Sequence, residues 1–345
     1  MPGQRPRKPL IVPVFIPNQG CPHRCIFCQQ EKITAQPIRP INGLEVKEAL
    51  ERAVGSARFD VRREPEVAFY GGTFTRLPTE KISELLEAVR PFVELGYFKA
   101  IRVSTRPDAL DKEKAELIKH LGVTTVELGS QSMDDMVLEL SRRGHTAGDT
   151  VEAVRLLRNH GFKVGIQLMP GLPGDSEESF MRTVEAVVKL HPDMVRLYPT
   201  VVIRGTELER WYLGRRYRPL SLEEAVRLCR MSCIQLEPKG IPVIRIGLMS
   251  SPSLLEQGVI VAGPWHEAFG FLVRSAIHQE KIGPYLPIPG EARKITLRVP
   301  RREIPLVRGY KNTGLRVIEE KTGASIMEIL ADEALAPGEI EVDRL

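Results

Sequence analysis

The sequence predicts an α/β protein, a partial (β/α)6 barrel of the TIM type followed by a small C-terminal α+β module. Six short apolar segments alternate with amphipathic segments along residues 10–198, which is the pattern of parallel strands joined by helical crossovers. Each apolar segment ends in glycine or polar residues, as a barrel with its active site at the carboxyl ends of the strands requires. A stretch rich in proline and glycine, residues 283–290, then separates the last 55 residues from the rest.

The expected elements follow from the spacing of apolar residues. Strands are expected at 10–16, 66–72, 100–105, 125–129, 163–169 and 193–198. Helices are expected at 44–57, 79–95, 111–121, within 133–160, and at 176–190, 221–237 and 266–280, with a candidate strand at 241–247. The chain therefore divides into a basic arm (1–9, with Arg5, Arg7 and Lys8), a barrel core (10–220), a helical extension (221–282) and the module (291–345).

Three of the five cysteines, Cys21, Cys25 and Cys28, stand within eight residues on the loop that follows the first strand. Zinc usually takes four protein ligands, as cysteine pairs or as cysteines with histidines, and no matching second pair is present. An iron–sulfur cubane fits the spacing C-x3-C-x2-C better, because three thiolates leave one iron open to a small molecule. The competing interpretation is a set of buried structural or zinc-binding thiols.

Composition favours a cytoplasmic protein. No apolar run approaches the ~18 residues that cross a bilayer, and the start of the sequence lacks the apolar core of a signal peptide. Clustered cysteines argue against a disulfide framework and for a reducing compartment. The net charge of +5, from 49 basic and 44 acidic residues, is too small to indicate a nucleic-acid partner by itself.

Polar and glycine residues at the strand ends supply a candidate pocket. Gly71 and Gly72 follow the second strand, where backbone can approach a ligand closely, although such a pair more often marks only a turn. Ser104 and Arg106 follow the third strand, where Pro107 fixes the strand exit.

The fourth and fifth strands carry polar residues among apolar ones. By alternation Glu127, Gly129 and Gln131 share one face of the fourth strand. A glutamate in an apolar parallel strand is destabilising unless it is paired, so we expect Glu127 in the barrel lumen. Gln167, between two apolar residues of the fifth strand, is a candidate hydrogen-bond partner for an adenine or ribose edge.

The cysteine spacing, with the aromatic Phe27 just before the third cysteine, resembles the signature of the radical S-adenosylmethionine (SAM) enzymes. The resemblance implies a 4Fe-4S cluster held by Cys21, Cys25 and Cys28, whose open iron binds the amino and carboxylate groups of SAM. It also implies an external one-electron donor of the flavodoxin or ferredoxin type. The electron would cleave SAM to methionine and a 5′-deoxyadenosyl radical.

Between about residue 10 and about residue 230, the strand-end segments resemble one branch of these enzymes in order. This branch includes oxygen-independent coproporphyrinogen oxidase and the catalytic subunit of Elongator, which modifies the wobble uridine of tRNA. The Elongator subunit is the better match. The matching segments are Gly71-Gly-Thr-Phe, Ser104-Thr-Arg-Pro-Asp, Glu127-Leu-Gly-Ser-Gln-Ser, Arg143-Gly-His-Thr, Met169-Pro-Gly-Leu-Pro-Gly and Tyr198-Pro-Thr-Val-Val-Ile-Arg-Gly-Thr.

The resemblance assigns roles to individual residues. It implies that Phe15 and Phe27 line the SAM site, and that Gly71, Gly72 and Thr73 meet the methionyl amino end. The residues implied for the carboxylate, ribose or adenine are Ser104, Gln131, Arg143 and Gln167, and the substrate candidates are Arg106, Glu127, Tyr198, Arg204 and Lys311. Two departures change what can be carried over. Arg204 stands where glutamate is common, and we expect no acetyltransferase domain like that of the Elongator subunit.

Residues 294–330 follow the order strand, helix, tight basic loop, helix, turn and strand, which resembles a KH RNA-binding domain. Gly309-Tyr-Lys-Asn312 takes the place of the GXXG loop, and asparagine tolerates the left-handed conformation that the missing glycine would adopt. Residues 293–316 hold eight basic residues and one acidic residue, which suits phosphates. Because residues 291–345 balance at ten basic and ten acidic, a solvated face on a dimerisation or lid domain is the alternative.

Cys229 and Cys233 lie one helical turn apart, close enough to share a metal. Apolar residues surround them, however, so we interpret them as buried free cysteines of the core.

The leading functional hypothesis is a radical SAM enzyme that acts on RNA, with tRNA favoured. The first alternative is the same chemistry on a small metabolite or tetrapyrrole. The second is a non-catalytic iron–sulfur protein that binds RNA, and the polar strand ends argue against it because such a protein needs no SAM pocket.

Overall fold

The structure is a computed structural model that describes residues 9–249 and 251–345. The predicted basic arm, apart from residue 9, lies outside the described residues. Within the described ranges, no helix combines the length and the apolar character that crossing a bilayer would need.

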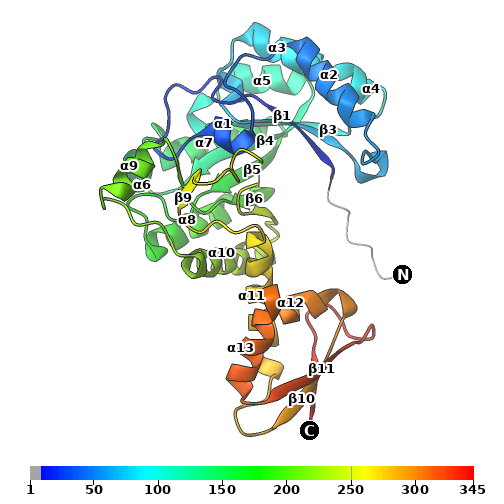
Figure 1. The fold of residues 1–345 in the computed structure, drawn as a ribbon. Coiled ribbons are helices and arrows are strands. Elements are labelled where there is room, and N and C mark those ends of the chain that lie inside the picture. The colour runs from blue at the N-terminus through cyan, green and yellow to red at the C-terminus, as the bar shows by residue number, and fades with distance from the viewer. Residues whose placement is uncertain (1–8, 250) are drawn as a thin grey trace.

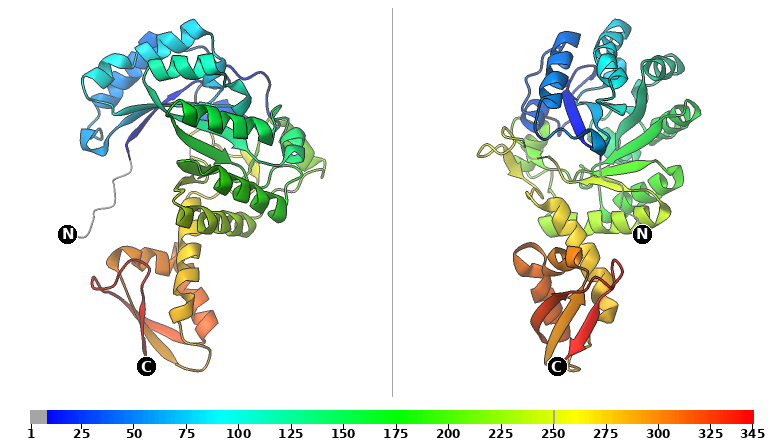
Figure 2. Two further views of the ribbon diagram at one scale, coloured as in Figure 1. Left: turned by 180° about the vertical axis from the view of Figure 1, so that it is seen from behind. Right: turned by 90° about the vertical axis from the view of Figure 1, so that its right-hand side faces the viewer.

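Seven parallel strands form the main sheet in the order β1-β2-β3-β4-β5-β6-β8. They are β1 (Ile11–Phe15), β2 (Glu66–Tyr70), β3 (Ala100–Thr105), β4 (Val123–Gln131), β5 (Lys163–Leu168), β6 (Met194–Leu197) and β8 (Val243–Ile246). The sheet curls, and helices cover its outer face (Figure 1, Figure 2). The predicted α/β partial barrel is confirmed, and the candidate strand at 241–247 supplies the seventh strand.

Helical crossovers connect the strands, as right-handed β-α-β units require. They are α2 (Gly43–Val54), α3 (Thr79–Glu87), α4 (Arg90–Glu94), α5 (Lys112–His120), α6 (Asp135–Leu140), α7 (Ala147–Asn159), α8 (Glu177–Leu190) and α10 (Leu222–Leu236). The barrel also carries α1 (Gln30–Thr34), β7 (Val202–Ile203), α9 (Glu207–Leu213) and β9 (Ile260–Ala262).

The prediction of one helix over 79–95 was wrong, because two helices occupy this range. Pro91 lies in the first turn of α4. Its nitrogen has no hydrogen to donate to a preceding turn, so a new helix starts there instead of continuing α3.

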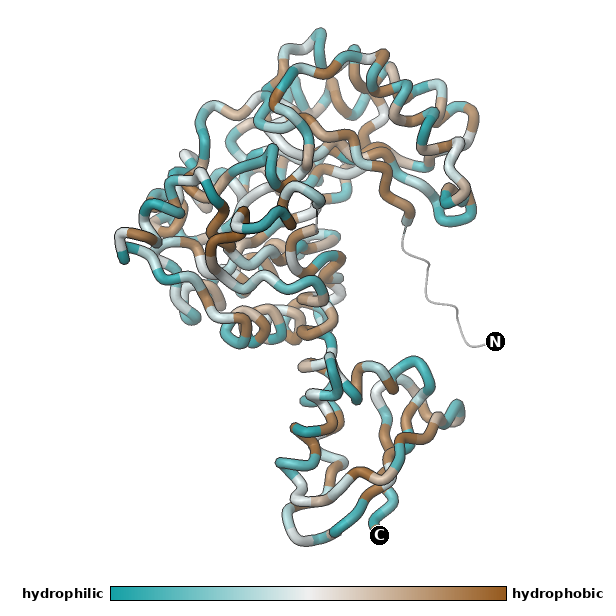
Figure 3. The backbone as a smooth tube through the Cα atoms, viewed as in Figure 1, coloured by the Kyte–Doolittle hydropathy of each residue, from teal (hydrophilic) through white to brown (hydrophobic). Residues whose placement is uncertain are grey.

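Alternation along the strands separates the core from the lumen. Outward residues such as Val67, Phe69 and Val126 are fully buried under the helices. The helices alternate between hydrophilic and hydrophobic residues along their turns, as amphipathic covering helices do (Figure 3). The inward positions of the same strands carry polar and charged residues, which makes the lumen a polar site.

Helix α11 (Phe269–Ile282) leads from the barrel to a second unit with a mixed three-stranded sheet (Figure 1). Its elements are β10 (Lys294–Val299), α12 (Ile304–Arg308), α13 (Thr313–Thr322), β11 (Ser325–Ala331) and β12 (Glu341–Arg344). The unit has its own apolar core around Leu297, Val307 and Ile318. Two side chains of α11 donate hydrogen bonds to backbone carbonyl groups of α12. Ser275 Oγ donates to the Leu306 carbonyl at 2.8 Å, and Gln279 Nε2 donates to the Val307 carbonyl at 2.8 Å.

Candidate active site

The loop after β1 is held in place by contacts to the end of β2. The Gln30 side-chain carbonyl accepts hydrogen bonds from the backbone N–H groups of Asn18, at 2.5 Å, and Gly72, at 2.9 Å. The Thr73 N–H donates to the Gln19 carbonyl at 2.7 Å. These bonds fix the cysteine loop against the β2 strand end.

Gly71 and Gly72 both have positive φ, 78° and 74°, which only glycine adopts without strain. A Cβ on Gly72 would lie 2.4 Å from the Gln19 carbonyl oxygen and 2.6 Å from that of Ile16. The pair therefore permits the close approach of the cysteine loop. Its predicted contact with the methionyl amino group stays a prediction.

The three loop thiols have different partners. Cys21 Sγ lies 3.3 Å from Thr73 Oγ1, and the buried Cys25 Sγ accepts a hydrogen bond from Arg143 Nη1 at 3.0 Å. Burial, together with the neighbouring Cys25 and Cys21 thiols, raises the pKa of the Cys28 thiol to about 12. Burial likewise raises the pKa of Cys21, while the Thr73 hydroxyl opposes this shift.

The donor set suits a cubane better than a single ion. No three His, Cys, Asp or Glu side chains within residues 9–249 and 251–345 are close enough to ligate one metal ion. A cubane binds each thiolate at a different iron, so its ligands stand farther apart than those of one ion. The three thiols come from one loop and match the number of thiolates that a cubane with one open iron takes from a protein. The buried Arg143 Nε, which has no hydrogen-bond partner among the described residues, is a donor still free for a bound acceptor.

The carboxyl ends of β4 and β5 bring together three residues predicted for the SAM site, Gln131, Arg143 and Gln167, and Gly129, which was predicted to share a face of the fourth strand with Gln131. Gln167 Nε2 donates to Gln131 Oε1 at 2.9 Å, and Arg143 Nη2 donates to the Gly129 carbonyl at 2.6 Å. The register between β4 and β5 shifts between Leu128 and Gln131, and Gln131 has φ 71°. A bulge with a left-handed, non-glycine residue is strained, and such strain is concentrated at functional sites.

Two further residues predicted for the SAM site, Phe15 and Ser104, lie in strands of the main sheet. Phe15 ends β1 and pairs in register with Tyr70, and Ser104 pairs with Glu127. Phe27 is half-buried and packs against two apolar clusters. The sequence missed Gln30, because its two contacts lie 12 and 42 residues away and its own segment carries no motif.

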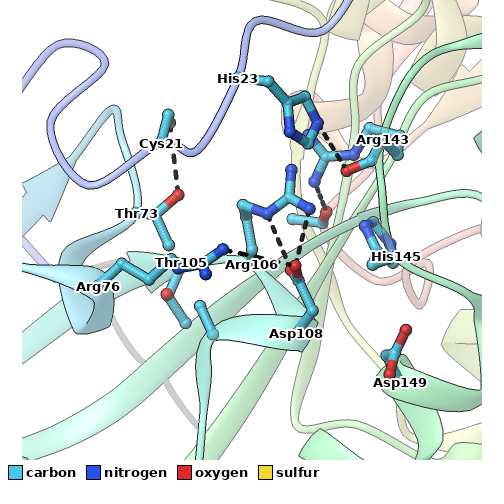
Figure 4. Close-up of polar contacts among 12 residues, drawn as sticks. Cys21, His23, Thr73, Arg76, Thr105, Arg106, Asp108, Arg143, His145 and Asp149 are labelled. Atoms are coloured by element: carbon cyan, nitrogen blue, oxygen red, sulfur yellow. Dashed lines mark hydrogen bonds and ion pairs between the residues drawn. The ribbon is translucent and has the colours of Figure 1, made fainter.

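Arg106 lies beside the cysteine loop and is buried (Figure 4). Its guanidinium binds both oxygens of Asp108, with Nε to Oδ1 at 2.8 Å and Nη2 to Oδ2 at 2.9 Å. His145 is buried nearby, and burial, reinforced by the Arg143 and Arg106 charges, lowers its pKa to about 4. The imidazole is therefore neutral at pH 7. Its Nε2 contacts the Ser130 carbonyl at 3.2 Å.

The lumen below the rim holds a buried network of paired charges. Glu127, 5% exposed, binds Arg102 Nη1 at 2.6 Å and Arg196 Nη2 at 2.9 Å through Oε1, and Tyr70 donates to the same oxygen at 3.1 Å. Arg196 Nη1 donates to Tyr198 Oη at 3.0 Å. Arg102 also pairs with Glu66. Burial, with the charge of Glu127, raises the pKa of Tyr70, which keeps this phenol protonated.

Gly165 makes room for this network, since a Cβ there would lie 3.1 Å from Glu127 Cγ. The sequence singled out Glu127 but missed Glu66, Arg102 and Arg196. The signal was available, because Arg102 and Arg196 are charged residues within strands that are largely buried.

The five substrate candidates do not form one group. Glu127 and Tyr198 share the lumen network, and Arg106 lies by the cysteine loop. Arg204 follows β7 and packs over Gly258, where a Cβ would lie 2.3 Å from Arg204 Nη2. Lys311 is exposed in the C-terminal unit.

The family model described as the radical SAM superfamily matches residues 15–187, and the radical SAM C-terminal domain model matches residues 192–279. The chain belongs to the radical SAM superfamily. It is therefore an enzyme whose cofactors are a 4Fe-4S cluster and SAM. Cys229 and Cys233 are buried in the barrel core, away from the loop thiols.

Two curated relatives extend this result. An uncharacterized protein of Methanocaldococcus jannaschii is 33% identical over 233 residues, which cover 63% of this chain and 69% of the relative. A tRNA uridine(34) acetyltransferase of the same organism is 37% identical over 164 residues, which cover 46% of this chain and 30% of the acetyltransferase. The chain thus matches less than a third of the length of that relative.

Among solved structures, the Elp3 of Methanocaldococcus infernus, with its first 46 residues deleted, superposes with a TM-score of 0.60 at 26% identity. The superposition covers 79% of this chain and 63% of that one. The resemblance to the Elongator branch is confirmed by these relatives.

Proposed function

We propose that this radical SAM enzyme modifies RNA, and that tRNA is its substrate. The similarity to a tRNA uridine(34) acetyltransferase supports a tRNA substrate. Within this chain, the main support for the proposal is an exposed basic face on the C-terminal unit. We treat residues 291–345 of this unit as an RNA-binding module.

Four exposed cations define this basic face, Arg302, Arg308, Lys311 and Arg316. None forms an ion pair with a described residue, whereas Arg298 and Arg301 of the same unit pair with carboxylates. The acidic residue of this segment, Glu303, is buried and accepts a hydrogen bond from the Gly338 N–H at 2.9 Å. Exposed cations without a carboxylate partner favour a polyanion, because binding releases its counterions.

The loop between α12 and α13 presents the centre of this basic face. Lys311 and Asn312 are both left-handed, with φ 51° and 62°. Gly309 and Gly314 let the two helices meet, since a Cβ on Gly314 would lie 2.2 Å from the Val307 carbonyl oxygen. The exposed Lys311 ammonium lies 5.3 Å from the centroid of the Tyr310 ring and has no ion-pair partner among the described residues, so it can exchange this contact for a phosphate.

The same loop contacts the barrel side of the molecule. Tyr310 Oη donates to Glu267 at 3.2 Å, and its ring packs edge-on against His266 at 4.7 Å. His266 and Glu267 immediately precede α11, whose first residue, Phe269, packs beside Gly247 at the carboxyl end of β8. RNA held on the basic face would therefore extend toward the strand ends where the site lies.

The chain's residues have separable roles in this proposal. Cys21, Cys25 and Cys28 hold the cluster, which when bound supplies the electron that cleaves SAM to methionine and a 5′-deoxyadenosyl radical. Gln131 and Gln167 orient the nucleoside of SAM at the rim. The lumen network keeps the floor beneath the rim polar and rigid, so a substrate base would meet hydrogen-bonding groups there.

The proposal is tested with total tRNA. The anaerobically reconstituted holoprotein is incubated with SAM, a reductant and tRNA, and tRNA nucleosides are then analysed by mass spectrometry. A new modified nucleoside that requires both SAM and Cys25 is expected. Failure to change any nucleoside, with SAM cleavage intact, would exclude tRNA as the substrate.

A binding measurement addresses the basic face separately. Lys311→Glu should weaken tRNA binding and reduce the slope of log K against log salt by ~0.7 for each lost phosphate contact. Lys321→Glu, an equal charge reversal at the far end of α13, is the matched control and should leave the slope unchanged. Equal slopes in the two variants would remove the basic face from the proposal.

A further inference from the structure

Arg245 lies in β8, the last strand of the main sheet, on the face that borders the lumen. It pairs in register with Arg196 of β6, whose side chain reaches Glu127 in the lumen. The next residue, Ile246, pairs with Leu197 and packs against the core on the outer face of the sheet. Successive residues of a strand point to opposite faces, so Arg245 points inward.

The guanidinium of Arg245 has no carboxylate partner. Its Nε donates to the Gly247 carbonyl at 3.3 Å, and within the described ranges this is its only hydrogen bond. No described carboxylate lies within ion-pair distance of it, although the side chain is half-buried. Both Nη groups are therefore available as donors to a ligand.

The neighbouring lumen network has no spare negative charge for this arginine. Arg102 and Arg196 pair with Glu66 and Glu127, which matches two cations with two carboxylates. Arg245 adds a third cation to the same face of the sheet, in register with Arg196. Like charges at paired positions of neighbouring strands are destabilising, and partial burial of an unpaired charge adds to the destabilisation. A bound anion would relieve both effects.

A cleft with an aromatic wall adjoins Arg245. Residues that follow β6 and β8 line it, and they include Pro199, Trp265 and Gly247, the residue to which Arg245 is bonded. The Trp265 side chain is half-buried. Arginine binds phosphate through two parallel N–H groups, and unpaired nucleobases stack on aromatic side chains. The two groups that one nucleotide needs, a cation and an aromatic ring, thus both adjoin Gly247.

The same part of the barrel is joined to the C-terminal unit. Phe269, the first residue of α11, packs beside Gly247, and the His266 ring contacts the Tyr310 ring of the module. Figure 1 shows α11 running from the barrel to the unit that carries α12 and α13. Because β8 is the outermost strand on this side of the sheet, RNA that runs from the basic face toward the lumen would pass this edge first.

We propose that Arg245 and Trp265 form a nucleotide subsite at the edge of the lumen, in which Arg245 binds a backbone phosphate and Trp265 stacks on the base. This subsite rests on the proposed RNA substrate, and it specifies where the strand enters the lumen. It is separate from the basic face, whose cations belong to the C-terminal unit, and it shares no residue with the predicted SAM site.

The test measures the affinity of total tRNA for the reconstituted holoprotein at several salt concentrations. Arg245→Gln should weaken binding by about tenfold or more at low salt and reduce the slope of log K against log salt by ~0.7, because one phosphate contact is lost. Arg245→Lys keeps the charge, so it should retain the slope while losing the two-pronged contact. Trp265→Leu should weaken binding by about tenfold without changing the slope, because stacking releases no counterions.

The matched control is Arg52→Gln, which removes an exposed charge from α2 and should change neither the affinity nor the slope. Iron content and thermal unfolding of each variant report that it is correctly assembled. The subsite is overturned, and the proposed function left standing, if the wild type binds tRNA and either Arg245→Gln or Trp265→Leu binds it equally well. If the wild type shows no salt-dependent affinity for tRNA, the proposed function fails and the subsite fails with it.

Discussion

Glu127 is the residue whose removal should most affect the stability of the barrel. Its carboxylate balances two buried guanidinium groups, Arg102 and Arg196, in the lumen. In Glu127→Gln, Arg102 keeps the carboxylate of Glu66, but Arg196 loses its carboxylate partner and is left with neutral acceptors, which include the hydroxyls of Tyr70 and Tyr198. An uncompensated buried charge of this kind typically destabilises a protein by ~3–5 kcal/mol.

The assay is thermal unfolding of the cluster-free, reduced protein, followed by tryptophan fluorescence. The expected loss corresponds to a fall in Tm of roughly 6–20 °C, at about 2–4 °C for each kcal/mol in a domain of this size. Glu256→Gln is the matched control, because its carboxylate, 57% exposed, pairs with Lys32 at the surface. That pair should contribute ~0–1 kcal/mol.

A double variant sharpens the test. Glu127→Gln combined with Arg196→Met removes both charges, so the pair should be less destabilised than the sum of the single variants. The reasoning is refuted if Glu127→Gln stays within about 1 kcal/mol of the wild type, or if the two single effects simply add.

Three further changes test the site. Gly72→Ala should destabilise the fold by ~1–3 kcal/mol and lower the amount of iron bound after reconstitution, because its Cβ would clash with two carbonyl oxygens. Gly96→Ala is the control, since Gly96 has a similar φ and nothing within 4 Å of its Cβ position, and it should retain full iron. Equal iron in both variants would refute the steric argument. Arg143→Gln should make the cluster's midpoint potential more negative, on the order of tens of millivolts, because Cys25 loses a charge-assisted hydrogen bond; an unchanged potential in an EPR-monitored titration would contradict this. His145 binds its proton less readily when folded than when unfolded, so its contribution lowers stability as pH falls from 6.5 to about 4, by up to about 3 kcal/mol. His145→Gln should flatten this part of the curve, and an identical pH profile would remove the histidine from the explanation.

The parts of the fold that sequence predicted well depend on local patterns. The strands alternate in period two or run apolar, and the cysteine triplet is confined to eight residues, so both are visible in short windows. The split of the helix at 79–95 was missed although Pro91 was present, because the apolar spacing continues across the break.

The contacts that organise the site were harder to predict, because they join distant segments. Gln30 reaches Gly72 across 42 residues, and Arg196 reaches Tyr70 across 126. Alternation flagged Glu127 as a buried charge in need of a partner, yet the strand order of the sheet was needed to identify which arginines meet it. Arg106 was predicted to face the pocket; its side chain lies beside the cysteine loop, and its pairing with Asp108 was not visible in the sequence.

The central claim is that Cys21, Cys25 and Cys28 hold a cluster that cleaves SAM. The direct measurement is 5′-deoxyadenosine formed by the anaerobically reconstituted protein with SAM and reductant. Alanine at any of the three positions should abolish the product, whereas Cys229→Ala and Cys233→Ala, which change buried core thiols, should retain it. Normal 5′-deoxyadenosine formation by Cys25→Ala would contradict the account.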